Sequence, residues 1–253
     1  MLLNILKEKN RVTIAELVEE FGVSEVSIRN DLAVLEERKL LVRVKGGAVH
    51  IHQSSEYDDI PVASKQVIHA REKQLLGAAA AAMVQDRDSI IIDSGTTTME
   101  VAKHLNPEQK LTIITNALDI AITLANKGKF DIIVLGGHVR NVSYSTVGIL
   151  SEVALKNFYC DKLFLGVDSV NIRDGISTPN IEEASLNQAM LESAKEVIAV
   201  FDSSKVDRRG FAHIAMLDRI NTVVTDNHIP DSLKEYLAIR GIKVRIVNVD
   251  ETN

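Results

Sequence analysis

The ten residues from Ser89 to Thr98, Ser-Ile-Ile-Ile-Asp-Ser-Gly-Thr-Thr-Thr, constrain the fold of this chain more than any other stretch. Their apolar, β-branched first half is typical of a strand that is buried on both faces. Their second half places small hydroxyl residues around Gly95, just before a helical pattern from Met99 to Leu105. The stretch therefore predicts a strand, a tight turn and a helix N-terminus. Unpaired backbone N–H groups and the positive end of the helix dipole favour an anion such as phosphate there.

The same ten residues also have a plainer interpretation. Ser94 or Thr96 serves only as a helix cap, and Gly95 serves only to make the turn. The local pattern does not choose between an anion site and a simple turn, so the decision depends on the other motifs of the chain.

The strand-turn-helix pattern repeats along the rest of the sequence. Further apolar runs that predict strands cover residues 111–115, 131–135, 162–167, 196–200, 222–225 and 243–247. A helix is predicted over residues 63–85, ahead of the first strand. Alternation of this kind predicts an α/β fold with a doubly wound parallel sheet. The composition agrees, because 45% of the residues are hydrophobic and only 4% are aromatic, which suits an interior of Ile, Val, Leu and Ala.

The first fifty residues follow a different pattern. Thr13 and Glu16 form a capping box at the start of an amphipathic helix, and a break at Gly22 leads to a third helix that Ser24 caps. Two helices joined by a short glycine turn are typical of a helix-turn-helix. A short hairpin follows, with Arg43 and Lys45 near its turn, as in a winged helix that contacts the DNA phosphates. The alternative is a generic three-helix cap with a solvated face.

Bulk charge does not mark the N-terminal segment as a nucleic-acid binder. The formal net charge of the chain is −6, and residues 1–52 carry eight basic and eight acidic residues. Contact with DNA must therefore depend on where the cations point.

These patterns give a domain division and exclude some classes of protein. We expect a winged helix-turn-helix DNA-binding domain over residues 1–50, a linker over 51–62 and an effector-binding and oligomerisation domain over 63–253. No apolar run approaches the ~18 to 20 residues of a membrane span, so we expect a cytoplasmic protein without membrane contact. The single cysteine excludes an internal disulfide and a cysteine-based metal cluster, and no metal site is expected.

The N-terminal residues resemble a known family. Residues 23–32, Leu35-Glu36 and residues 43–48 closely resemble the N-terminal motif of the DeoR family of bacterial sugar-catabolism repressors. Many members of that family have a second basic residue where this chain has Asn30. The resemblance implies contact with double-stranded operator DNA, for which we single out Ser24, Ser27, Arg29, Asn30, Arg43 and Lys45. Arg29 either binds a guanine edge or clamps a phosphate, and the sequence does not decide which.

The predicted strands of the second domain end in small or polar residues. Ligands of a doubly wound sheet bind beyond the carboxyl ends of its strands, so these residues are expected to converge on one crevice. Groups that suit a phosphate are Ser94, Gly95, Thr96, Thr97, Thr98, Gly136, Gly137, Arg140 and Lys205. Groups that suit sugar hydroxyls are Asn116, Asp168 and Glu183. Taken singly, Thr115, Asn116 and Gly136 are better explained as turn residues at strand ends.

The same clusters extend the resemblance over nearly the whole chain. They look like the effector domain of the DeoR family in residues 93–98, 115–116, 136–137, 164–168, 175–184 and 202–205. That domain is similar in fold to ribose-5-phosphate isomerase, and the resemblance adds Asp93 to the effector-binding residues. Within the family, residues 28–31 and the loop 93–98 look most like the amino-sugar repressors of the N-acetylgalactosamine type.

The function predicted from the sequence is transcriptional repression of a carbohydrate-catabolism operon. A homo-oligomer, dimer or tetramer, holds the operator until a phosphorylated sugar binds, and no cofactor is needed. The runner-up is a phosphosugar isomerase or deaminase relative with a fused DNA-binding domain. The chain continues Ser169-Val170-Asn171 after Asp168 and so lacks the second acid that proton transfer between sugar carbons needs; we therefore predict no enzyme. A third interpretation is a repressor whose pocket is purely structural.

Overall fold

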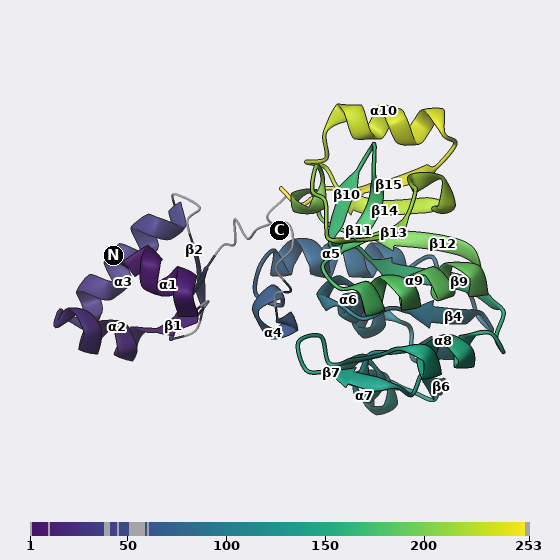
Figure 1. Ribbon diagram of the computed structural model, residues 1–253, viewed down its shortest axis with the longest axis horizontal. Helices are drawn as coiled ribbons and strands as arrows, with labels where there is room; N and C mark the ends of the chain where they lie inside the picture. Colours follow the sequence, from purple (N-terminus) through teal and green to yellow (C-terminus); the bar gives the residue numbers. More distant parts are fainter. Residues whose placement is uncertain are drawn as a thin grey trace. The chain divides into compact units, whose positions relative to one another are not determined.

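The computed structural model describes residues 2–9, 11–37, 41–44, 46–50, 59 and 61–250, and it divides into two compact units (Figure 1). The first unit is Met1–Ile68 and the second is His69–Asn253. The division falls six residues after residue 63, where the sequence placed the start of the second domain. Most of the predicted linker lies outside the described residues.

The N-terminal unit is a helix-turn-helix with a small antiparallel sheet. Its elements are α1 (Leu2–Lys9), β1 (Arg11–Thr13), α2 (Ile14–Phe21), α3 (Glu25–Glu37), β2 (Leu41–Val44), β3 (Gly47–His50) and α4 (Val62–Lys65). The strands pair in the order β1-β3-β2. The hairpin of β2 and β3 confirms the predicted wing, whereas β1 was not predicted. Leu6, Leu17, Ile28, Leu32 and Leu41 are almost fully buried and form most of the core of this unit.

The ends of α2 and α3 follow the predicted capping. The amide of Glu16 donates to Thr13 Oγ1 at 3.2 Å, and the amide of Thr13 donates to Glu16 Oε2 at 2.6 Å. Gly22 ends α2 in the left-handed conformation, with a φ of 63°, which glycine adopts without steric cost. The amide of Ser27 donates to Ser24 Oγ at 3.2 Å and so caps α3. The helix-turn-helix prediction is therefore confirmed in its local detail.

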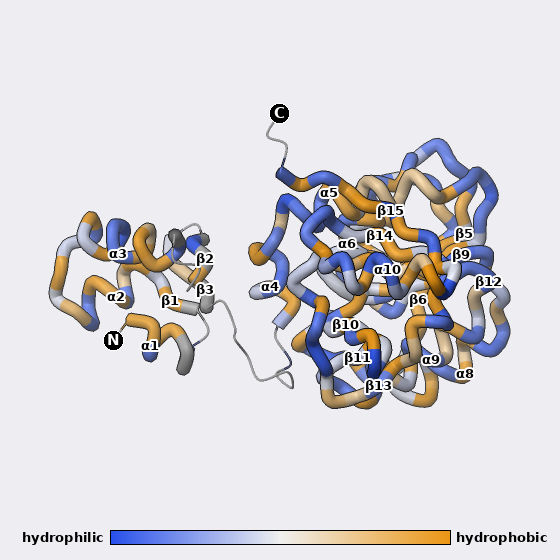
Figure 2. The backbone as a smooth tube through the Cα atoms, turned by 90° about the horizontal axis from the view of Figure 1, so that it is seen from above, coloured by the Kyte–Doolittle hydropathy of each residue, from blue (hydrophilic) through white to orange (hydrophobic). Residues whose placement is uncertain are grey.

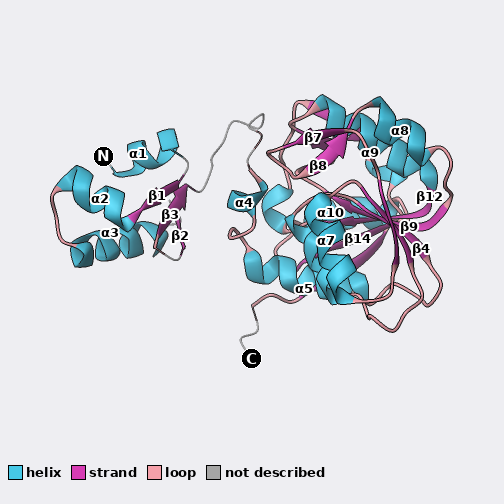
Figure 3. Ribbon diagram, turned by 90° about the horizontal axis from the view of Figure 1, so that it is seen from below, coloured by secondary structure: helices cyan, strands magenta, loops and turns pink. Residues whose placement is uncertain are grey.

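The second unit is built on a seven-stranded sheet in the order β15-β14-β12-β9-β4-β5-β6, in which every pair is parallel. These strands are β4 (Ser89–Ile92), β5 (Thr112–Thr115), β6 (Asp131–Val134), β9 (Cys160–Gly166), β12 (Ala194–Val200), β14 (Thr222–Asp226) and β15 (Lys243–Val247). The chain moves outward from β4 to β6, returns to β9 beside β4, and then moves outward the other way. The strand order therefore reverses between β4 and β9, which confirms the doubly wound prediction. Figure 3 shows the twist of the sheet as a fan of strands.

Helices cover both faces of this sheet, as the alternating burial of its strands requires. Ile90 and Ile92 pack with α5 (Ala70–Ala81), α6 (Thr96–His104) and α7 (Leu118–Lys127). Ile91 points to the opposite face and packs with α8 (Ile149–Leu155), α9 (Ile181–Ser193) and α10 (Asp231–Ile239). Figure 2 shows the hydrophobic residues of the strands in orange, running through the interior of the unit.

Several smaller elements were not predicted. They are the hairpin β7 (His138–Arg140) and β8 (Ser145–Val147), the antiparallel sheet β10 (Ser169–Asn171), β11 (Gly175–Thr178) and β13 (Ala212–Ala215), and two 3-10 turns, η1 (Ser203–Lys205) and η2 (Leu217–Arg219). The helix predicted over residues 63–85 is confirmed only in part, because it is not continuous. It is interrupted between Lys65 and Ala70, where His69 takes a φ of 52°, and it ends at Ala81. None of the helices in the described ranges is long and apolar enough to cross a bilayer.

Candidate functional site

The exposed face of α3 carries the residues that were predicted to contact DNA. Ser24, Ser27, Arg29 and Asn30 are all exposed near its N-terminus. Ser24 Oγ and Ser27 Oγ lie 3.0 Å apart, so the two hydroxyls share a hydrogen bond. The Arg29 guanidinium donates to Glu25 Oε1 at 2.5 Å, one turn earlier on the same helix. Because both side chains of this ion pair are more than half exposed, the pair is weak, and a DNA phosphate or guanine edge can replace Glu25.

Of the two hairpin residues predicted to contact DNA, the structure describes Arg43. The backbone amide of Arg43 on β2 donates to Glu36 Oε1 at 2.8 Å, and its guanidinium lies 3.9 Å from Glu36 Oε2. This contact joins the wing to the end of α3 while leaving Arg43 exposed. Lys45 lies outside the described residues.

In the second unit, Asp93 lies where β4 ends, beside β9 at the reversal of strand order. Its side chain is 4% exposed. Burial, together with the nearby charges of Glu183 and Asp168, raises the pKa of Asp93 to about 8, although hydrogen bonds from the Ser94 amide and Asn187 oppose this shift. A Cβ at Gly166 would lie 3.2 Å from the Ser94 carbonyl oxygen, so glycine permits the close approach of β9 to the Asp93 loop. Asp93 is therefore largely protonated at neutral pH.

A group of polar residues comes together around Glu183 and Asp168, whose charges act on Asp93. The Thr178 hydroxyl lies 3.2 Å from Glu183 Oε2 and 3.5 Å from Asp168 Oδ2, so it can donate to either carboxylate. The Arg140 guanidinium forms an ion pair with Glu183 and donates to Ser143 Oγ. Arg140 was predicted to bind phosphate, but Glu183 neutralises its charge in this structure. The group is rich in carboxylate oxygens, which are good acceptors for sugar hydroxyls.

The loop from Ser94 to Thr98 forms the first turn of α6, as predicted. Thr97 and Thr98 are buried, and the Thr98 hydroxyl donates to the Gly95 carbonyl oxygen at 3.0 Å. Ser94, Gly95 and Thr96 are partly exposed. The side-chain hydroxyls of Ser94 and Thr96 and the backbone N–H groups of the first turn are therefore the parts of this loop that an anion can reach.

The residues predicted at the ends of β5 and β6 make mostly structural contacts. The Asn116 amide nitrogen donates to the Thr146 carbonyl oxygen at 3.3 Å, and its Oδ1 is buried without a hydrogen-bond partner among the described residues. The Gly136 carbonyl oxygen accepts from Ser151 Oγ at 2.6 Å. A Cβ at Gly137 would lie 2.5 Å from Ser151 Oγ. These contacts hold the loop against β8 and α8.

The end of β12 carries a second charged group. Asp202 is 2% exposed and accepts from the Ser204 amide at 3.1 Å, so it caps η1, which contains Lys205. Burial alone would raise the pKa of Asp202, but the Lys205 ammonium, the Ser204 hydrogen bond and the charges of His69 and Lys73 hold that pKa below its ordinary value.

Sequence reasoning missed His69 and Lys73. Lys73 is only 4% exposed and lies on the buried face of α5, three residues before Leu76 and seven before Ala80. A lysine in line with apolar residues at helical spacing is a signal that the sequence already contained. Because a buried ammonium needs partners, such a lysine marks a polar site.

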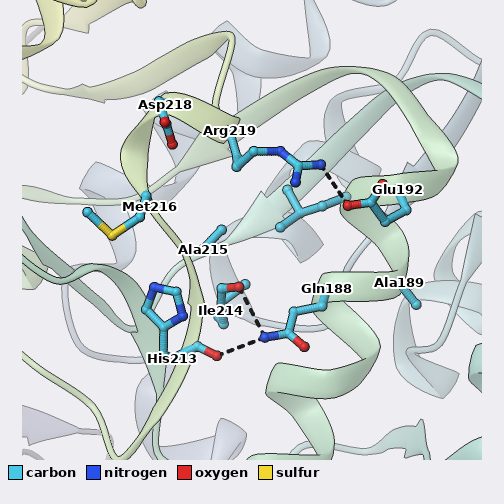
Figure 4. A pocket seen from close by; sticks show the side chains of 10 residues that line it. Gln188, Ala189, Glu192, His213, Ile214, Ala215, Met216, Asp218 and Arg219 are labelled. Atoms are coloured by element: carbon cyan, nitrogen blue, oxygen red, sulfur yellow. Dashed lines mark hydrogen bonds and ion pairs between the residues drawn. The ribbon is translucent and has the colours of Figure 1, made fainter.

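Two cavities lie away from these groups. One, of about 560 Å³, lies between α9 and β13, where Gln188 donates to two backbone carbonyls and Arg219 pairs with Glu192 (Figure 4). The other, of about 590 Å³, lies at the amino ends of the strands and contains Asp88 and Lys162. No residue predicted to bind the effector lines either cavity.

An exposed winged helix-turn-helix in one unit and polar residues at the switch point of a doubly wound sheet in the other define a DNA-binding transcriptional regulator with a sensor domain. Residues 1–54 match the DeoR-like helix-turn-helix domain, and residues 68–227 match the DeoR C terminal sensor domain. The chain belongs to the DeoR family.

Similar proteins include other regulators. The chain is 35% identical to a putative aga operon transcriptional repressor of Escherichia coli O157:H7 over 242 residues, which are 96% of this chain and 90% of that protein. It is 31% identical to a lactose phosphotransferase system repressor of Staphylococcus epidermidis, covering 88% and 89% of the two chains. A solved ribose 5-phosphate isomerase A from Methanocaldococcus jannaschii matches with a TM-score of 0.41 at 15% identity, over 55% of each chain. The named relatives favour a regulator over the enzyme alternative.

Proposed function

We propose that this regulator represses a carbohydrate-catabolism operon and that a phosphorylated sugar releases it from its operator. The observation that carries the proposal is the gathering of Asp93, Asp168, Glu183 and Thr178 at the switch point between β4 and β9. The names of the two repressors reported above support an operon of sugar utilisation. The aga operon repressor and the loop 93–98 together favour the amino-sugar subgroup.

The charges at the site suggest how the effector lies. Asp168 accepts hydrogen bonds from sugar hydroxyls and repels a phosphate. Glu183, which is paired with Arg140, adds further acceptor oxygens. The phosphate is therefore expected at the first turn of α6 and near Lys205. Asp93 does not repel it at neutral pH, because its pKa of about 8 keeps most of this carboxyl neutral. The ends of β4 and β12 are two strand spacings apart, roughly 10 Å, and a phosphorylated hexose can bridge this span.

Release requires that the sugar bind the state of low operator affinity more tightly. A ~10²-fold loss of operator affinity corresponds to about 2.7 kcal/mol of differential binding. In the complex with DNA, α3 lies in the major groove, and the Arg29 guanidinium binds the DNA in place of the Glu25 carboxylate. One near-neutral winged helix makes few contacts, so we propose that a homo-oligomer, dimer or tetramer, presents a symmetric pair to the operator.

The test is operator retardation in the presence of a panel of pentose and hexosamine phosphates and of the same sugars without phosphate. We expect at least one phosphosugar, and no unphosphorylated sugar, to raise the operator Kd of the wild-type chain. The ratio of operator Kd with and without that phosphosugar should fall toward one in Lys205→Ala. It should remain as in wild type in Lys234→Ala, a matched lysine on α10 that pairs with Asp231.

A wild-type complex that no phosphosugar disturbs would contradict the proposal. The same incubations also address the enzyme alternative. We expect no isomerised or deaminated product, and clear turnover of one of these sugars would favour an isomerase or deaminase relative instead.

A further inference from the structure

The helix α3 carries a large apolar side chain on its outer face, near its N-terminus. Val26 is 67% exposed, although a β-branched residue is a poor helix former and most of this side chain is not buried. Its neighbours Ser27, Arg29 and Asn30 are exposed as well, and all three are polar. A single exposed valine is ordinary on a protein surface, so its position around the helix decides whether it has a role.

Val26 lies on the side of α3 that is turned away from the core of its unit. Ile28 is 1% exposed and marks the inner face of the helix. Successive residues of an α-helix are about 100° apart, so Val26 and Asn30, each two residues from Ile28, both lie about 160° around the helix axis from it. They are one turn apart and together form an outward ridge, which we call the α3 ridge.

The charged and capping side chains of α3 lie beside this ridge. Arg29 is one residue from Ile28, about 100° around the helix from it, and its guanidinium is paired with Glu25. Ser27 lies at the same angle on the other side, and its hydroxyl shares a hydrogen bond with the Ser24 hydroxyl, which also caps the helix. The α3 ridge is therefore uncharged and presents a branched hydrocarbon and an amide.

These two groups match the major-groove edges of one kind of base pair. The Asn30 side chain is exposed and makes no hydrogen bond with the described part of the chain. An asparagine amide both donates and accepts, so it matches the N6 donor and the N7 acceptor of adenine. The apolar group of the major groove is the C5 methyl of thymine, which suits the hydrocarbon of Val26. Both side chains of the α3 ridge therefore suit A·T base pairs.

We propose that in each half-site the Val26 side chain contacts the C5 methyl of a thymine and the Asn30 amide binds the N6 and N7 atoms of an adenine. Residues one turn apart on a helix are about 6 Å apart along its axis, and base pairs stack about 3.4 Å apart. The two bases therefore lie within about two base-pair steps of each other. The inference rests on the operator binding of the proposed function, extends it to bases that the operator contains, and adds Val26 to the residues predicted to contact DNA.

The first experiment selects duplexes from a pool with a randomised central region, using the full chain. Wild type is compared with Val26→Ala, Asn30→Ala and the control Val34→Ala. Val34 is 46% exposed and lies nearer the C-terminal end of α3, whereas base contacts come from the N-terminal residues of a recognition helix. We expect Val26→Ala to lose a preference for thymine at one position of the half-site. Asn30→Ala should lose a preference for adenine nearby, and Val34→Ala should select the wild-type half-site.

The second experiment changes single groups of the duplex that wild type selects. Deoxyuridine replaces the thymine in one half-site and lacks only its methyl group. We expect it to weaken wild-type binding about 4-fold, the contribution of one buried methyl group, and to leave the affinity of Val26→Ala nearly unchanged.

In a separate duplex, 7-deazaadenine replaces the adenine in one half-site and lacks its N7 acceptor. We expect it to weaken wild-type binding about 2- to 10-fold, the loss of one hydrogen bond. The affinity of Asn30→Ala should be nearly unchanged by this replacement, because that variant has no amide to lose the bond.

The outcomes separate this inference from the proposed function. The inference is wrong if the variants select the wild-type bases, or if a modified base weakens its matching variant as much as it weakens wild type; release of wild type by a phosphosugar then still supports the proposed function. If the modified bases act as expected but no phosphosugar releases wild type, the inference stands and the proposed function fails. A wild-type chain that enriches no common sequence would overturn the inference together with the operator binding on which it rests.

Discussion

Asp93 is a buried carboxyl that retains its proton in the folded chain up to a pH of about 8, mainly because burial disfavours its charged form. In the unfolded chain the same group ionises near its ordinary value of 3.8. Between these two pH values the folded state binds more protons than the unfolded state. The contribution of Asp93 to stability is therefore greatest below pH 4, falls as the pH rises toward 8, and changes little above that.

Replacing Asp93 with asparagine should remove this dependence, since the neutral amide resembles the protonated acid. We expect Asp93→Asn to be as stable as wild type near pH 4 and more stable at pH 8 by more than about 1.4 kcal/mol, the equivalent of one pKa unit. Urea unfolding at both pH values measures the difference. The control is Asp231→Asn, whose side chain is 88% exposed. A constant difference between Asp93→Asn and wild type across the range would show that Asp93 is ionised when folded.

At the scale of secondary-structure elements, the strands of the large sheet were predictable and several other elements were not. An apolar β-branched run such as Ile90-Ile91-Ile92 is typical of a buried strand, so the sequence alone identifies β4. The helix α9 was missed because it buries polar Asn187 and Ser193 along with apolar residues, which blurs its periodicity. The break before α5 depends on the left-handed backbone conformation of His69. A histidine in the sequence does not predict that conformation.

Some residues of the candidate site were also predictable from the sequence, and others were not. Asp93, Asp168, Glu183 and Arg140 follow from strand ends and from the family resemblance, and the structure brings them together. The Arg140–Glu183 ion pair was not predictable, because it joins β7 to α9, and neither element was expected. Lys73 was missed for a different reason: it lies within the predicted helix range, but a lysine is seldom buried, and its position on the buried face was not predicted.

The turn between β4 and α6 gives a prediction with a matched control in the same sheet. Gly95 has a φ of 138° and a ψ of 165°, a region open only to glycine. Gly136 has no positive φ and no atom within 4 Å of an added Cβ. We expect Gly95→Ala to reduce the free energy of unfolding by about 1–3 kcal/mol and Gly136→Ala to leave it nearly unchanged, as measured by urea denaturation. If the two substitutions reduced the free energy of unfolding equally, the backbone conformation of Gly95 would not be the cause of the loss.

At the scale of the whole molecule, the chain supplies one reading helix per copy. On the α3 face, Arg29 forms an exposed ion pair with Glu25, and we propose that DNA replaces Glu25 as its partner. Symmetric pairs of such helices read two half-sites about 10 base pairs apart or a multiple of this. In a homo-oligomer, both copies that bind the operator therefore carry each substitution in α3.

The prediction that follows compares duplexes carrying one and two half-sites. Loss of one arginine contact with a base costs about 1–3 kcal/mol, so Arg29→Ala should weaken binding to a single half-site by about 5- to 150-fold. On the intact operator the loss should be close to the square of that factor, because both copies lose the contact. The control is Arg87→Ala in the sensor unit, whose side chain is 79% exposed; it should bind both duplexes as wild type does. Equal losses on the two duplexes would mean that one copy binds alone, and no loss on either would remove Arg29 from the reading face.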